Sequence, residues 1–254
     1  MFVKIIDNIK MGVVVFIILL FIFGCMSLKT HINTVYEKPK YVKDYRIGSE
    51  NFVFLVKEVQ PVLCFEGECP SIVESTASGL VFSSDNNSIF VLTAAHFCEQ
   101  DPESSLFFIQ TIYGFAGDIP RELHPLYMDL DKDLCMLFGL KDESENYSNI
   151  KIAKETIIGE DVYTVAAPDG IAGPGKRPIF TGKMAGCDKD ICMTTLPATF
   201  GSSGAGIYNS KNELISIVMA VPQEFNHVVI SPSREDVIKF IQIIDESVDI
   251  YSYK

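Results

Sequence analysis

Three stretches of this sequence carry side chains that together can activate a hydroxyl group. A histidine, His96, lies in VLTAAHFC, directly after an apolar run with the composition of a strand. An aspartate, Asp133, precedes the apolar run LCML, and a pair of serines lies further on in TFGSSGAGIY. A serine hydroxyl is a poor nucleophile at neutral pH unless a base such as imidazole accepts its proton, and a carboxylate can orient that base. The three stretches therefore predict a nucleophilic site if the fold brings them together.

The residues around the serine pair have little or no side chain: Gly201, Gly204, Ala205 and Gly206. One interpretation is a flexible turn, because turns use glycine and serine. The other is that bare backbone N–H groups must come close to a reacting atom while a hydroxyl is presented to it. Ser202 and Ser203 are both candidates for that hydroxyl.

The elements that must position these groups are mostly strands. After residue 50 the sequence consists of short β-type runs separated by turn residues, as in FVFLVK, SIFVLTA and ELISIVMAV, a spacing typical of an all-β barrel or sandwich. The polar stretch KDESENYSN divides the runs into a first group, at about residues 50–140, and a second group, at about residues 150–232. Ser233 and Asp236, followed by an apolar stripe, predict a closing helix over residues 233–247.

This order of motifs resembles the trypsin-like (chymotrypsin-fold) serine peptidases, in their bacterial type. TAAH around His96, Asp133 before an apolar run, and the G-x-S-G pattern of Gly201–Gly204 carry the resemblance, which covers about residues 50–247. The resemblance implies an all-β peptidase domain of two six-stranded antiparallel β-barrels with a C-terminal helix. The catalytic groove would lie between the two barrels.

The resemblance also implies roles for the residues. Ser203 would be the nucleophile of peptide-bond hydrolysis, His96 its general base and then acid, and Asp133 the carboxylate that orients the imidazole. The backbone N–H groups of Gly201 and Ser203 would form the oxyanion hole. Asp129 and Asp131 are alternatives to Asp133, which we prefer because an apolar run follows it directly.

Two departures from the commonest family pattern bear on function. Ser202 stands where many members have the aspartate that pairs with a newly cut N-terminus, and no IVGG start precedes the first barrel, so we expect no activation cleavage. Ala205 replaces the second glycine after the nucleophile. A methyl group at this position can crowd the turn that presents the nucleophile. The alternative function is therefore that of a catalytically inactive trypsin-like binding protein at the cell envelope.

Substrate preference is expected to depend on the residues before the nucleophile and on the strand after it. TTLPATFGS contains no carboxylate that would select Lys or Arg, and Pro197 lies near the expected pocket base. Met219 and Val221 are expected to line the pocket, which favours small or aliphatic side chains before the scissile bond. His227 either approaches the pocket floor, where it would select acidic or polar residues, or lies on the surface.

The N-terminus, residues 1–25, has the features of a membrane-targeting segment. Its apolar stretch ends in FIFGC, which resembles a bacterial lipobox and makes Cys25 a candidate for lipidation. The alternative is an uncleaved signal anchor that extends to about Leu28. Residues 26–49 are then a tether, and either anchor predicts an extracytoplasmic, membrane-anchored protein of the cell envelope.

Cysteines and charge limit the remaining choices. Of the seven cysteines, six remain if Cys25 is lipidated, and their simplest pairing is Cys64–Cys69, Cys98–Cys135 and Cys187–Cys192, with reduced buried cysteines as the alternative. Their spacing is not that of a zinc site, and we expect no metal or cofactor. A net charge of −12 argues against nucleic acid. The expected partners are a protein or peptide substrate and the membrane, with the oligomeric state undetermined.

Overall fold

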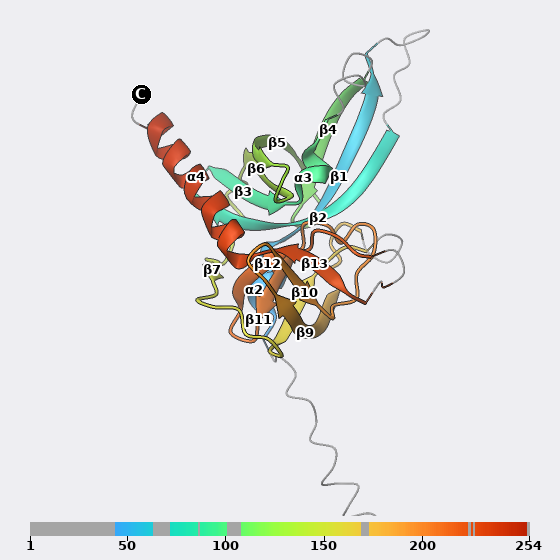
Figure 1. Cartoon of the computed structure of the whole chain (residues 1–254). Coiled ribbons are helices and arrows are strands. Elements are labelled where there is room, and N and C mark those ends of the chain that lie inside the picture. Colours follow the sequence, from blue (N-terminus) through green and yellow to red (C-terminus); the bar gives the residue numbers. More distant parts are fainter. Residues whose placement is uncertain are drawn as a thin grey trace, which may run out of the picture. The chain divides into compact units, whose positions relative to one another are not determined.

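The strands of the first half pair into a closed antiparallel barrel in the order β1-β2-β3-β6-β5-β4 (Figure 1). These strands are β1 (Phe52–Pro61), β2 (Ile72–Ser84), β3 (Ser88–Thr93), β4 (Phe108–Phe115), β5 (Pro120–Asp129) and β6 (Leu134–Leu140). Side chains of alternate residues, such as Val53 and Leu55 in β1, point into the barrel and are fully buried. The short helix α3 (Ala95–Cys98) directly follows β3.

The second half is a sheet rather than the closed six-stranded barrel expected from the family. Its seven strands have the order β13-β10-β9-β8-β11-β12-β7. They are β7 (Lys151–Ile152), β8 (Asp161–Val165), β9 (Ile179–Cys187), β10 (Ile191–Thr194), β11 (Gly206–Asn209), β12 (Glu213–Ile217) and β13 (Val229–Pro232). The sheet is also not purely antiparallel, because β7 pairs with β12 in parallel.

The second sheet does not close because the ladder between β12 and β13 is interrupted. After Ile217 the chain leaves the strand, and Ala220 forms only an isolated bridge with Ile230. Met219 and Ala220 each donate a backbone N–H to the Ile230 carbonyl, but no continuous ladder forms there. Residues 219–222 line the cleft described below.

The C-terminal helix α4 (Arg234–Ser252) extends along both β structures in Figure 1. Ser233 and Asp236 form the predicted cap: the Asp236 N–H donates to Ser233 Oγ at 3.2 Å, and the Ser233 hydroxyl donates to Asp236 Oδ2 at 2.8 Å. Phe240 on the apolar stripe is buried and packs on Tyr127 of β5, with ring centroids 5.4 Å apart. The Arg234 guanidinium donates to the Ala153 carbonyl of the second half. The helix thus contacts both halves.

The computed structural model describes residues 44–62, 72–85, 87–100, 108–168, 173–222, 225 and 227–252. The expected targeting segment, Cys25 and the pair Cys64–Cys69 lie outside these residues. In the part that is described, no helix is both long enough and apolar enough to cross a membrane.

The described residues begin at residue 44, within the segment expected to be a tether. Residues 46–49 belong to helix α2 (Arg46–Asn51). Gly48 lies so close to the rings of Tyr163 and Tyr208 that a Cβ would be 2.8 and 3.2 Å from them, so a glycine is needed at this contact. Asn51, which is fully buried, donates to the carbonyls of Val81 and Ser148.

Candidate active site

His96 lies in α3, at the point where the chain leaves β3 for the surface. Its backbone N–H donates to Asp133 Oδ1 at 2.8 Å, and its ring Nδ1 is 2.8 Å from Asp133 Oδ2. Because a carboxylate only accepts, Nδ1 carries the proton and Nε2 is left as the basic nitrogen. The side chain is 51% exposed, so the ring can be reached by a substrate. Backbone and side chain of His96 are both fixed by one carboxylate.

Asp133 is the carboxylate of the DLDKD run that meets the histidine. It occupies the left-handed region with φ 53°, at the end of the turn between β5 and β6. The carboxylate of Asp129 instead accepts the Lys132 N–H at 3.0 Å, and Asp131 is exposed. The local turn therefore separates the roles of three aspartates.

The serine loop consists of two successive type II turns. Ser202 N–H donates to the Thr199 carbonyl at 3.0 Å, and Ala205 N–H donates to the Ser202 carbonyl at 3.1 Å. The third residue of each turn has a positive φ: 84° at Gly201 and 83° at Gly204. A type II turn requires such a residue, which explains the spacing of the two glycines. Among the described residues, nothing accepts from the N–H groups of Gly201 and Ser203.

The first half holds this loop from below. Ser78 of β2 donates its backbone N–H to the Ser203 carbonyl at 2.8 Å and its hydroxyl to the Gly201 carbonyl at 2.8 Å. A Cβ at Gly204 would overlap Thr93 Oγ1 and the Ser78 carbonyl. The glycine thus permits a close backbone approach as well as the turn. No local pattern in the sequence pointed to Ser78, because its contact with Gly201 joins residues 123 positions apart.

A cleft of about 790 Å³ joins these groups, since His96, Asp133 and Ser203 all line it. No hydrogen bond links the Ser203 hydroxyl to the His96 ring in the described structure. Catalytic hydrogen bonds are often long without substrate and tighten when it binds. The remaining lining residues are Glu99, Leu130, Asp131, Ala198, Thr199, Phe200, Met219, Ala220, Val221 and Pro222.

The sequence model of the trypsin-like peptidase domain matches residues 77–217. The chain belongs to this family. By family, the protein is a serine endopeptidase, a hydrolase, as the order of its motifs predicted. No curated protein was found to match the chain.

Solved structures of similar fold accompany the family match. A serine endoprotease from Yersinia pestis is 17% identical with a TM-score of 0.58; the alignment covers 78% of this chain but only 63% of that protease. An inactive serine-to-alanine mutant of Rv3671c from M. tuberculosis H37Rv is 15% identical with a TM-score of 0.58, and the alignment covers 82% of this chain and 94% of the other. Deg5 is 14% identical with a TM-score of 0.57, over 77% and 88% of the two chains. At these identities the likeness is one of fold.

The two candidate serines of the peptidase differ in direction. Ser202 is only 1% exposed, and its hydroxyl oxygen accepts the Thr199 N–H at 3.4 Å. Ser203 is part of the cleft lining. The methyl group of Ala205 is fully buried in the core of the second half.

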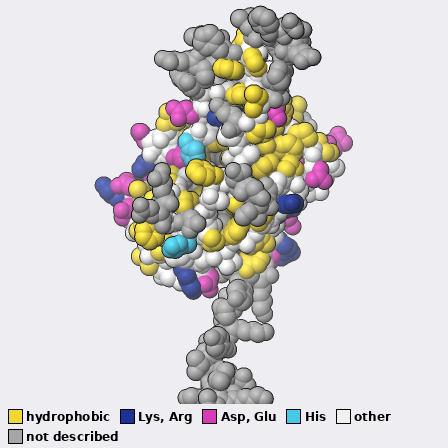
Figure 2. All heavy atoms as spheres, turned by 90° about the vertical axis from the view of Figure 1, so that its right-hand side faces the viewer, with side chains coloured by type: hydrophobic (Ala, Val, Ile, Leu, Met, Phe, Trp, Pro, Cys, Tyr) yellow, Lys and Arg dark blue, Asp and Glu magenta, His cyan; other side chains and the backbone are white. Residues whose placement is uncertain are grey.

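The expected specificity residues of the peptidase divide into two pairs. Met219 and Val221 line the cleft. Pro197 does not line the cleft. Successive side chains of residues 196–198 point to opposite sides, so that Leu196 and Ala198 are buried and Pro197 is exposed. His227 is also outside the cleft lining: it is exposed and packs on Phe225, with ring centroids 5.8 Å apart. The face in Figure 2 carries many hydrophobic side chains, with Lys and Arg mainly near its margins.

Two of the expected disulfides of the peptidase are present, Cys98–Cys135 and Cys187–Cys192. Cys98 lies two residues after His96 and Cys135 two residues after Asp133, so the first disulfide joins the elements that carry this pair. Among the described residues, no group of histidines, cysteines and carboxylates has the arrangement of a metal site.

Proposed function

We propose that this protein hydrolyses peptide bonds through a Ser203–His96–Asp133 triad and a covalent acyl-enzyme. His96 Nε2 accepts the Ser203 hydroxyl proton while Oγ attacks the scissile carbonyl carbon. The imidazolium, stabilised by Asp133, then gives this proton to the leaving amine as the C–N bond breaks. A water molecule, deprotonated by the same imidazole, hydrolyses the ester and restores the serine.

The observation that carries the proposal is the double contact between His96 and Asp133 at one wall of a cleft that Ser203 also lines. Because Asp133 binds both the backbone N–H and the ring Nδ1 of His96, the imidazole has one orientation, and its Nε2 is preorganised as a base. The His96–Asp133 pair and the shared cleft support general-base activation of Ser203.

The oxyanion site is proposed at the N–H groups of Gly201 and Ser203. A type II turn at Gly201 reverses the direction of the Phe200–Gly201 peptide relative to a type I turn, and both N–H groups lack acceptors among the described residues. Donors that are already oriented stabilise charge developing in the transition state without reorganisation. No activation cleavage is needed in this proposal, because uncharged Ser202 is already held by Thr199.

We also propose a preference for small or aliphatic side chains before the scissile bond. Met219, Ala220 and Val221 present an apolar wall to the cleft. The carboxylates in the cleft lining, Glu99, Asp131 and Asp133, come from the first half and not from this wall. A charged side chain placed against the wall would lose hydration without gaining a partner.

The envelope location is likewise a proposal. It rests on the apolar N-terminal segment with Cys25 and on two disulfides, which persist in oxidising compartments. Mass spectrometry of the mature N-terminus tests it: a lipidated Cys25 or an intact apolar segment supports anchoring, and a free N-terminus beyond residue 28 contradicts it.

A fluorophosphonate probe tests the triad. We expect one probe per chain in the wild type, retained in Ser202→Ala and lost in Ser203→Ala, because only Ser203 faces the cleft. His96→Ala should slow labelling by at least 100-fold, since the base is removed. A folded wild-type protein that does not label would favour the alternative of an inactive binding protein, and loss of labelling in Ser202→Ala alone would reassign the nucleophile.

A further inference from the structure

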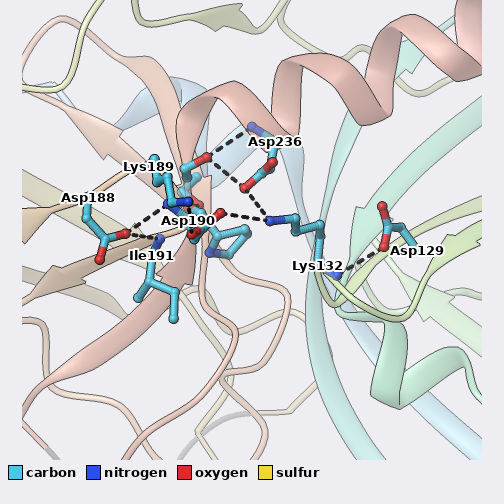
Figure 3. A network of polar contacts seen from close by, with 10 residues as sticks. Asp129, Lys132, Asp188, Lys189, Asp190, Ile191 and Asp236 are labelled. Carbon is cyan, nitrogen blue, oxygen red and sulfur yellow. Dashed lines mark hydrogen bonds and ion pairs between the residues drawn. The ribbon is translucent and has the colours of Figure 1, made fainter.

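Lys132 directly precedes Asp133, but its side chain leads away from the cleft. Figure 3 shows it extending from the turn between β5 and β6 to two carboxylates of the second half. Its Nζ is 3.2 Å from Asp236 Oδ2 and 3.4 Å from Asp190 Oδ1. Its backbone N–H is bound by Asp129. Lys132 is therefore fixed at both its main chain and its ammonium group.

The two carboxylates belong to hydrogen-bonded elements of the second half. Asp236 lies in the first turn of α4, is 8% exposed, and is held by Ser233 through both its N–H and its carboxylate. Asp190 lies in the turn between β9 and β10, which is shaped by Asp188 accepting the N–H groups of Asp190 and Ile191 (Figure 3). The ammonium group thus spans the junction between the two halves.

Because Lys132 directly precedes Asp133 in the chain, its ion pairs bear on the conformation of Asp133. The Asp133 backbone has φ 53°, which a residue with a side chain rarely adopts unless its surroundings impose it. Its carboxylate holds the His96 N–H and ring on one side. On the other side its chain neighbour is anchored to α4. The position of His96 relative to the serine loop then depends on two sets of contacts: the hydrogen bonds between Asp133 and His96, and the ion pairs of Lys132.

We propose that Lys132 is a positioning residue for the triad: its ion pairs with Asp236 and Asp190 fix the Asp133 turn, and through it His96, relative to Ser203. This inference rests on the proposed function. It predicts that loss of the ammonium group impairs the chemical step more than substrate binding, because Lys132 is not part of the cleft lining.

An ordinary surface ion pair would not have this effect, because such pairs contribute little. Lys132 differs in the burial of its partner, since removing the cation leaves the Asp236 carboxylate buried without it. In agreement, the Asp236 carboxylate, with a smaller effect from Asp190, raises the pKa of Lys132 above its ordinary value.

The test compares Lys132→Met and Lys132→Arg with Lys183→Met in the full chain. Lys183 pairs with Asp161 at 2.6 Å within the second half, so its replacement removes an equal charge and one ion pair away from the junction. For Lys132→Met we expect a 10- to 100-fold fall in kcat, a KM within threefold of wild type, and an equal fall in the rate of fluorophosphonate labelling. Lys132→Arg should recover activity to within about threefold, and Lys183→Met should match wild type.

Folding and chemistry are separated by working well below the unfolding temperature of each variant. A folded Lys132→Met protein with wild-type kcat and labelling rate would overturn the proposal, as would a Lys183→Met protein with the same loss. If Lys132→Met does not fold, Asp190→Asn, which removes the exposed partner, should still lower kcat by a few fold, and an unchanged kcat would contradict the link. A wild-type protein that never labels would refute the proposed function itself, which is a different result.

Discussion

At the scale of single residues, direction rather than identity separates the roles of neighbours. Ser202 and Ser203 have the same side chain, yet one is buried beneath Thr199 and the other faces the cleft. The aspartates of the DLDKD run differ in the same way, since only Asp133 reaches His96. Side-chain direction also explains why Met219 and Val221 line the cleft and Pro197 does not.

Substrate preference is a prediction at this scale. A panel of chromogenic peptides that differ only before the scissile bond should give kcat/KM values at least tenfold higher for Ala, Val or Leu than for Lys or Arg. The reason is that the wall formed by Met219, Ala220 and Val221 offers a cation no partner. A preference for arginine would contradict it. Ser203→Ala serves as the control for background hydrolysis.

At the scale of elements, short pieces of structure hold the base and its carboxylate. The four-residue helix α3 carries His96, and β6 begins directly after Asp133. The Cys98–Cys135 disulfide joins these two elements, and both cysteines are fully buried. By contrast, the Cys187–Cys192 disulfide closes the β9–β10 hairpin, which is distant in the chain from His96 and Asp133.

Removal of the first disulfide should therefore affect catalysis more than removal of the second. For Cys98→Ala/Cys135→Ala we expect a loss of about 4 kcal/mol in the free energy of unfolding, because the loop is long, and a fall of at least tenfold in kcat. For Cys187→Ala/Cys192→Ala we expect about 2 kcal/mol and a fall in kcat of no more than a few fold, since the hairpin also carries Asp190, a partner of Lys132. Denaturant unfolding and steady-state kinetics measure both. Equal kcat values in the two double variants would contradict the assignment.

At the scale of the whole molecule, the junction between the halves is a set of specific polar contacts. Ser78, from the barrel, holds the carbonyls of Gly201 and Ser203 and accepts the Ala167 N–H with its hydroxyl. The helix α4 contacts both halves, as Phe240 and Arg234 show. The serine loop therefore takes its position from the barrel as well as from its own sheet.

A matched pair of serine variants tests this view of the junction. Ser78→Ala leaves the Gly201 carbonyl and the Ala167 N–H without their partner, which should cost about 1–3 kcal/mol of stability and lower kcat at least fivefold. Ser216→Ala removes a hydroxyl that is equally buried but bonds to Pro232 within the second half. It should lose comparable stability with an unchanged kcat. The idea fails if both variants keep wild-type kcat.

Much of this architecture could be predicted because it is determined locally. Ser233 and Asp236 predicted the cap of α4, although the helix extends beyond residue 247. The polar stretch at residues 141–149 lies between the end of β6 and the start of β7. The closure of the second half could not be predicted, because it depends on how far the residues after Ile217, which line the cleft, also pair with β13. Such pairing depends on contacts between distant segments and not on the sequence of one segment.

By itself, the sequence determined the chemistry available and the local backbone: a base, a carboxylate and a hydroxyl in family order, with glycines at Gly201 and Gly204 where φ must be positive. These features follow from side-chain type and from steric limits on adjacent residues. Only the tertiary structure decided which groups meet. Ser78 under the serine loop, Lys132 across the junction, and the exclusion of Pro197 and His227 from the cleft depend on strand register and side-chain direction. Those are fixed by contacts between residues far apart in the chain.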